Sequence, residues 1–166
     1  MNDTTTALDE AAIRAMPAGR AMDLLIAERV MGCRFWFEKR GDYTWFLIQR
    51  PGDREPYKRS QNWERQMERY TEASPAAYDP QRHIMPDGVP PGYSTNIAAA
   101  WQVVEAVKGH PFSRRDRFTK ELQRIVSEDT ALMKGEMVHF SHLWFHVRAE
   151  HLCRAALLSS LPASPG

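Results

Sequence analysis

Apolar side chains first recur at helical spacing between residues 18 and 31. The positions concerned, at i, i+3, i+4 and i+8, are Met22, Leu25, Ile26 and Val30. This spacing predicts an amphipathic helix with one apolar face, and it places Asp23 on the opposite face, in contact with water. Gly32 follows and is suited to the left-handed backbone that often ends a helix.

Directly after Gly32 the period of the pattern changes from helical to two. Residues 33–38 alternate between apolar and polar or charged side chains, apart from Trp36, and residues 43–49 are rich in aromatic and β-branched side chains. The turn-forming sequence Arg40-Gly41-Asp42 lies between them. The pattern therefore predicts a β-hairpin over residues 33–49.

The best-marked helix is predicted over residues 96–108. Ser94, Thr95 and Asn96 are all residues that cap helix N-termini well, and the apolar positions that follow repeat at helical spacing. Trp101 belongs to this apolar repeat, and we expect its indole to lie at a contact between the helix and a sheet.

Three more elements are predicted in the last third of the chain. Apolar spacing predicts a surface helix over residues 114–128 and a second helix over residues 150–161. Between them, residues 137–147 are aromatic and favour a β-strand.

Proline divides the chain into one domain with an insertion. Residues 51–92 hold seven of the eleven prolines, which predicts a long surface excursion. Within it, Trp63, Met67 and Tyr70 have the spacing of one face of a short helix. We expect a flexible arm or a marginal helix over residues 1–16, a single domain over 17–161 and a loose tail over 162–166.

Three blocks in fixed order carry a resemblance to a known family: residues 21–32 (AMDLLIAERVMG), 93–105 (YSTNIAAAWQVVE) and 152–158 (LCRAALL). Together they resemble the phage ABA sandwich domain family, small proteins encoded by tailed phages and prophages. The resemblance implies a three-layer α/β/α sandwich, in which a small, mostly antiparallel or mixed sheet carries helices on both faces. Because the family has no general catalytic assignment, the resemblance implies an accessory, non-catalytic protein that acts in the cytoplasm of the host cell.

Composition narrows the function further. The 166 residues carry 22 Lys and Arg against 21 Asp and Glu, so a net charge of +1 provides no global field for nucleic acid. The chain has no apolar run of about 20 residues, the length that crosses a membrane. The two cysteines, Cys33 and Cys153, fit buried positions better than a disulfide framework. Acidic residues near the start argue against a secretory signal and for a cytoplasmic protein.

Motifs for catalysis are missing from the sequence. It contains no glycine-rich phosphate loop and no nucleophile elbow, so a hydrolase is the weakest of the functional hypotheses. His139, His142 and His146 lie near one another in sequence, but a strand would hold them too far apart or on opposite faces for one metal ion. The sequence therefore predicts neither a metal nor a cofactor.

The candidate ligand site combines a helix start with a basic cluster. The N–H groups that begin the helix at Ser94, Thr95 and Asn96 favour an anion, and Tyr93 is placed to stack on a base. A guanidinium from the cluster Arg114, Arg115 and Arg117 would complete the charge. This predicts capture of a small phosphorylated, nucleotide-like molecule, and the resemblance to phage proteins implies a host immune signal as an example.

Other interpretations of the same residues stay open. Ser94, Thr95 and Asn96 are also what structural capping requires, and the arginines are also typical of a solvated helix face. The alternative function is a protein–protein interaction module that interferes with a host factor. A homo-oligomer is compatible with the sequence as well.

Overall fold

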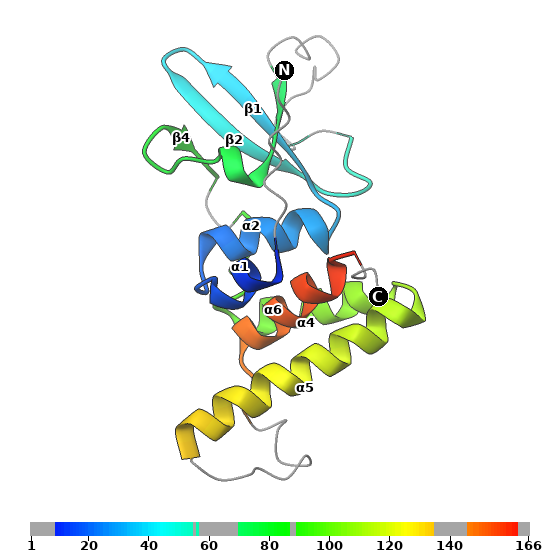
Figure 1. Cartoon of the computed structure of the whole chain (residues 1–166). Helices are drawn as coiled ribbons and strands as arrows, with labels where there is room; N and C mark the ends of the chain where they lie inside the picture. Colours follow the sequence, from blue (N-terminus) through cyan, green and yellow to red (C-terminus); the bar gives the residue numbers. More distant parts are fainter. Residues whose placement is uncertain (1–8, 55, 57–69, 87–88, 135–145, 163–166) are drawn as a thin grey trace.

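The computed structural model describes residues 9–54, 56, 70–86, 89–134 and 146–162 (Figure 1). The helices are α1 (Glu10–Ala15), α2 (Arg20–Arg29), the 3-10 turn η2 (Pro75–Ala77), α4 (Ile97–Lys108), α5 (Phe112–Lys134) and α6 (Ala149–Ser160). The strands are β1 (Arg34–Arg40), β2 (Tyr43–Gln49), β3 (Tyr70–Ala73) and β4 (His83–Ile84). The predicted hairpin and the helices near 18–31, 96–108, 114–128 and 150–161 are therefore all confirmed, although α5 is longer than the pattern indicated.

The four described strands form one mixed sheet in the order β3-β1-β2-β4. The hairpin pairs β1 with β2 in antiparallel register, with Phe35 opposite Ile48 and Phe37 opposite Phe46. Gly41 turns the chain with a φ of 60°, a conformation that other residues adopt at a cost. On the outer sides, β3 runs antiparallel to β1, and β4 runs parallel to β2.

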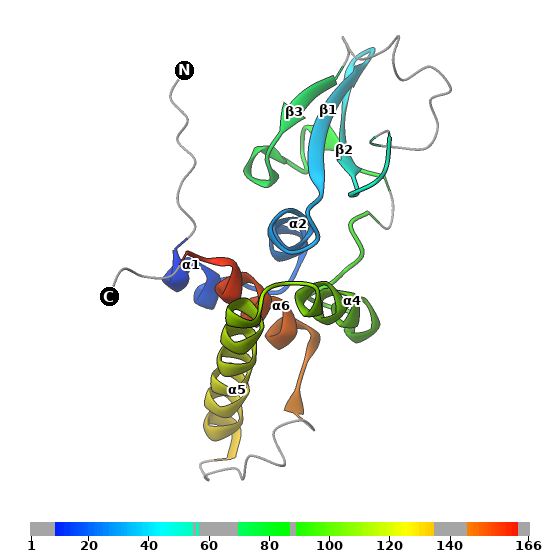
Figure 2. The same ribbon diagram turned by 90° about the vertical axis from the view of Figure 1, so that its right-hand side faces the viewer.

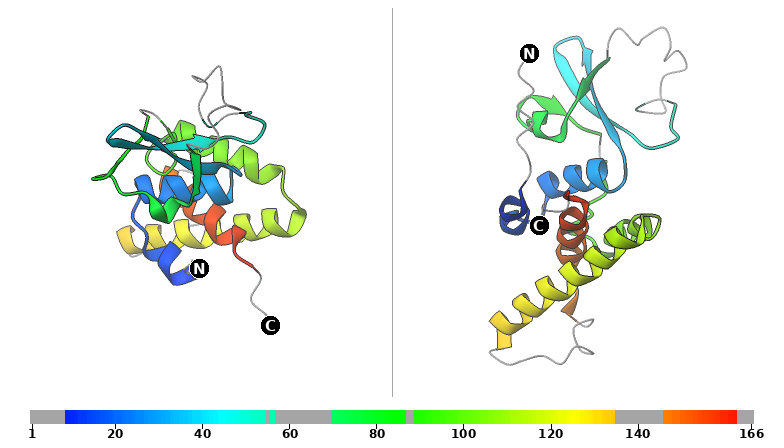
Figure 3. Two further views of the ribbon diagram at one scale, coloured as in Figure 1. Left: turned by 90° about the horizontal axis from the view of Figure 1, so that it is seen from above. Right: turned by 45° about the vertical axis from the view of Figure 1, so that its right-hand side comes forward.

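One face of the sheet packs on α2, and the remaining α-helices lie farther from the sheet than α2 does (Figure 2). Phe35, Phe46 and Ile48 enter the same buried core as Met22 and Ile26 of α2. Figure 2 shows the described α-helices gathered on one side of the sheet, and Figure 3 shows α5 running beneath α6. The α/β class and the mixed sheet are thus confirmed, whereas the three-layer arrangement with helices on both faces is not confirmed by the described helices.

The ends of the core differ from the boundaries predicted. Asp9 caps α1 by accepting a hydrogen bond from the N–H of Ala12 at 2.6 Å, and Ile13 is completely buried in the core. Arg154 of α6 also donates a hydrogen bond to the carbonyl of Met16 at 2.9 Å. For residues 9–16 the structure thus shows the short helix and not the flexible arm, because the single apolar side chain of Ile13 anchors it to the core.

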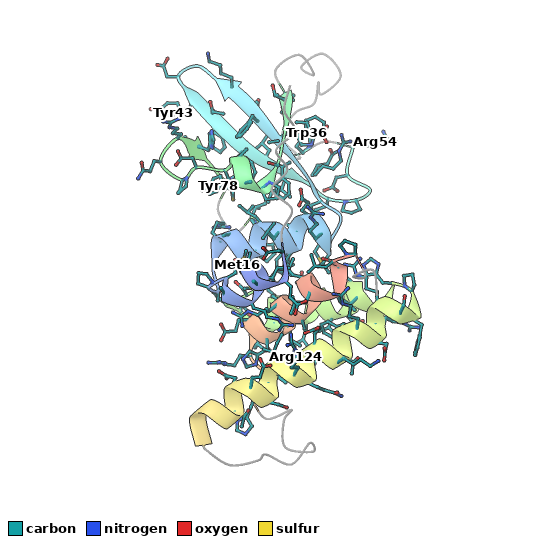
Figure 4. The ribbon with its side chains drawn as sticks, viewed as in Figure 1. Met16, Trp36, Tyr43, Arg54, Tyr78 and Arg124 are labelled. Carbon is teal, nitrogen blue, oxygen red and sulfur yellow. The ribbon has the colours of Figure 1, made fainter. Side chains whose placement is uncertain are left out.

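The excursion over residues 51–92 is also more than a surface insertion. It contributes β3 and β4, the two outer strands of the described sheet. The ring of Tyr78 lies 5.1 Å from that of Phe46, centroid to centroid, so this segment also closes the core beneath the sheet (Figure 4). The strand predicted over residues 137–147 lies largely outside the described residues, and so do Trp63 and Met67. Cys33 and Cys153 are both buried and free, as predicted.

Candidate binding surfaces

The segment that enters α4 begins the candidate ligand site, and its polar groups are bonded within the protein. The Asn96 side chain accepts hydrogen bonds from the N–H groups of Ala98 and Ala99, at 2.9 and 3.4 Å. Thr95 donates from its hydroxyl to the carbonyl of Gly92 at 3.4 Å. Asn96 is therefore a structural N-cap, and it occupies donors that a bound anion would need.

Ser94 is buried against Asp23, the residue that the sequence pattern placed in water. Its backbone N–H and its hydroxyl both donate to Oδ1 of Asp23, at 2.7 and 2.8 Å. The hydroxyl oxygen in turn accepts from the N–H of Gly19 at 2.8 Å. The exposure predicted for Asp23 is wrong, because its carboxylate ties the start of α2 to the loop before α4.

Tyr93 is only 5% exposed and belongs to the core. Burial raises the pKa of its phenol to about 12, and the nearby Cys33, Asp23 and Cys153 add to the shift. A ring buried in this way does not lie at the surface, where it would have to stack on a ligand.

Two of the three arginines in the basic cluster at the start of α5 are bonded to other parts of the protein. Arg114 donates to the carbonyl of Arg29, at the end of α2, at 3.1 Å. Arg117 donates to the carbonyl of Leu161 at 2.9 Å. Arg115 is exposed, and its guanidinium carbon lies 5.9 Å from the centre of the Phe112 ring.

The two halves of the candidate ligand site lie at opposite ends of α2. Ser94 is bonded to Gly19 and Asp23 at the start of that helix, whereas Arg114 is bonded to Arg29 at its end. At about 1.5 Å per residue, these ends are about 15 Å apart. The structure therefore does not bring the capped helix start and the arginines together around one phosphate.

Sequence analysis missed an exposed apolar surface on α4, and the expected position of Trp101 is wrong. Trp101 is 49% exposed and Ile97 is 46% exposed, whereas Ala99, Ala100 and Val103 of the same helix are buried. The sequence does contain an indication of this orientation. Small apolar residues form a second stripe along α4, and this stripe lets the helix approach α6 closely. We call Ile97, Ala98 and Trp101, all of them exposed, the α4 face.

The described histidines support no metal site. No group of three or more His, Cys, Asp or Glu side chains that could hold an ion occurs within the described ranges, and His139 and His142 lie outside them. His151 is buried, and its Nδ1 accepts a hydrogen bond from the backbone N–H of Arg148 at 3.2 Å. Burial and the Arg148 charge lower the pKa of His151, which favours the neutral imidazole that this contact requires.

Comparison of the chain with protein-family models, curated proteins and solved structures finds no match. Among the helices that the structure describes, none combines the length and apolar character needed to cross a bilayer.

Proposed function

We propose that this protein is a non-catalytic binding protein that recognises another protein through the α4 face. The observation that carries the proposal is the exposure of Trp101 on a regular, capped helix. Ile97 lies one turn before it, so the two side chains project from neighbouring positions on the same surface.

Physical chemistry favours a protein as the partner of these side chains. Tryptophan is enriched among the residues that dominate the energies of protein interfaces, because its large ring buries much apolar area. An exposed helix with apolar residues at i and i+4 is also the arrangement by which helices dock into apolar grooves. The resemblance to the phage sandwich family supports a host protein as the partner, and the host cytoplasm as the place where they meet.

The hypothesis of a small nucleotide-like ligand has weaker support. Tyr93 and Ser94 are buried, Asn96 caps its own helix, and the arginines lie near the far end of α2. Binding through the α4 face does not require residues from distant parts of the chain to come together, because Ile97 and Trp101 are neighbours on one helix and both are exposed.

Matched aromatic variants test the proposal. Tagged wild type, Trp101→Ala and Tyr43→Ala are produced in bacterial cells, and the proteins that co-purify are quantified by mass spectrometry and then titrated in purified form. Tyr43 is an exposed aromatic residue on the hairpin, in the sheet and not in the helical part of the protein that contains α4, and serves as the control (Figure 4). We expect Trp101→Ala to bind the partner at least about tenfold more weakly, and Tyr43→Ala to bind it as wild type does. Equal binding by all three proteins would overturn the proposal.

A further inference from the structure

We infer that the partner presents an acidic surface to the beginning of α5, next to an apolar group that covers Phe112. The surface concerned, which we call the arginine corner, consists of Phe112, Arg114, Arg115 and Arg117. This inference rests on the proposed function, because it specifies the chemistry of the protein that α4 recognises.

Charge is concentrated around the arginine corner. Residues 108–124 contain six Lys or Arg and two acidic residues, a local net charge of +4 in a chain whose total is +1. Lys120 and Arg124 pair with carboxylates of α5, namely Asp116 and Glu121. Arg114, Arg115 and Arg117, in contrast, form no ion pair with any carboxylate in the described part of the chain, so their charges remain uncompensated there.

The position of these arginines in the first turns of α5 raises the local positive potential further. The N-terminal end of a helix carries a partial positive charge and favours acidic side chains. The first turn of α5 contains no acidic residue, and it includes Arg114 and Arg115. The local sequence thus places like charges together at a stability cost, which is typical of positions kept for binding.

Phe112 adds an apolar contact to the same corner. It is 73% exposed, the highest value among the large apolar residues that the structure shows as exposed. The guanidinium of Arg115 lies beside its ring, so an apolar anchor and a cation stand together at the surface. A carboxylate near an aromatic or aliphatic side chain on the partner would satisfy both groups, and arginine binds carboxylates in a specific, bidentate geometry.

Nucleic acid is the other polyanion that an arginine cluster attracts, and the structure favours it less. Arg114 and Arg117 already donate to backbone carbonyls of α2 and of the C-terminal segment, which leaves Arg115 as the exposed arginine of the corner. The exposed side chain next to Arg115, that of Phe112, is apolar. Such a surface fits a protein better than a phosphate backbone.

A peptide selection tests the inference directly. A random library of peptides of about 12 residues is selected on immobilised wild-type protein, and the enriched peptides are titrated against wild type, Arg115→Glu, Phe112→Ser and Trp101→Ala. Arg82→Glu is the matched control, because Arg82 is also exposed but lies just before β4, on the sheet. Each variant is first shown to melt as wild type does.

We expect enriched peptides with net negative charge and at least one large apolar residue. Arg115→Glu and Phe112→Ser should each weaken their binding about tenfold or more, Arg82→Glu should leave it unchanged, and salt should weaken it. Neutral or basic peptides that depend on Trp101 but not on Arg115 would overturn this inference and leave the proposed function standing. Failure to enrich any peptide on wild-type protein would count against both. Arg115-dependent binding of a labelled oligonucleotide at physiological salt would assign the corner to nucleic acid instead.

Discussion

Ser94 and Asp23, 71 positions apart in sequence, are joined by two hydrogen bonds to a single carboxylate oxygen, one from the backbone N–H and one from the hydroxyl of Ser94. Both residues are buried, so the bonds are shielded from water. They fix the start of α2 to the loop that leads into α4. The α4 face is therefore held in place by a polar contact as well as by the apolar packing of the helix.

Removal of this contact is expected to destabilise the protein. Ser94→Ala should lower the free energy of unfolding by about 1.5–3 kcal/mol, because it deletes a hydrogen bond to a charged group and leaves the carboxylate less satisfied. Urea denaturation measures the loss. Thr95→Ala, next in sequence but exposed, is the control and should change the stability by less than about 0.5 kcal/mol. Equal effects of the two variants would show that the Asp23 contact contributes nothing special.

Trp101 and Val103 give a direct contrast within one helix. Trp101→Ala should change the free energy of unfolding by less than about 1 kcal/mol because the indole is half exposed, whereas the fully buried Val103 should cost about 2 kcal/mol when replaced by alanine. Denaturant melts of the two variants decide the matter. A larger loss for Trp101→Ala than for Val103→Ala would place the indole inside the core and remove the basis of the proposed interface.

The stability of the protein is expected to fall between neutral and mildly acidic pH. Because the pKa of His151 is lowered in the folded protein from the usual 6.5, the unfolded chain binds the proton first as the pH falls below about 6.5. Stability is therefore full above that pH and declines below it, down to the lowered folded pKa. Unfolding free energies measured between about pH 7.5 and 5.5 should show this slope, and His151→Gln should reduce it.

His110 is the control for that experiment, because its pKa is also lowered, by desolvation and by Arg114. His110→Gln should remove only its own part of the slope. If His151→Gln leaves the pH dependence unchanged, the imidazole is not the group that titrates.

The two cysteines should resist alkylation while the protein is folded. Burial raises the pKa of Cys153 to about 12 and also raises that of Cys33, so neither thiol forms appreciable thiolate near pH 8. Mass spectrometry after treatment with iodoacetamide should show little modification of native protein, and modification of both residues in denaturant. Rapid labelling of either residue in the native protein would contradict its placement in the core.

Deletion of residues 55–88 is expected to abolish the cooperative melt. The deletion removes β3 and β4 from the sheet and removes Tyr78 from its contact with Phe46. Circular dichroism and a thermal melt report the result. The single substitution Tyr78→Ala provides a milder test, with an expected loss of about 1–3 kcal/mol, because the ring is only partly buried against the core. A deletion variant that melts cooperatively near the wild-type temperature would restore the interpretation of this segment as a surface insertion.

The α4 helix shows what the sequence could and could not predict. An N-cap among Ser94, Thr95 and Asn96 and the helical repeat that follows are local properties, and the structure confirms both, with Asn96 as the capping residue. Which face of α4 is buried was not predicted correctly, because the helix carries two apolar stripes. Bulky Ile97 and Trp101 suggested the core, but α4 packs on α6 through small residues, which allow two helices to approach closely.

Hydrogen bonds between residues far apart in sequence also could not be predicted from the pattern of apolar and polar positions. Nothing near Asp23 indicates that Ser94 will cover it, and nothing near Arg114 indicates that its guanidinium will bond to the end of α2. A charged residue between apolar neighbours normally faces water. Ser94 and Arg114, two residues of the predicted ligand site, are held by contacts of this kind. They therefore lie at separate ends of α2 and not around one phosphate.

The position of α2 between the sheet and α6 determines which fragments of this protein can fold by themselves. Met22, Asp23, Leu24, Ile26 and Ala27 are all buried, so most of the circumference of the helix is covered, by the sheet on one side and by α6 on the other. A fragment that contained α2 with only the sheet, or α2 with only the other helices, would expose one apolar side of α2 to solvent. Truncation is thus an unsuitable route to a minimal binding unit, and transplanting Ile97, Ala98 and Trp101 onto an unrelated, stable helix is the better way to isolate the surface.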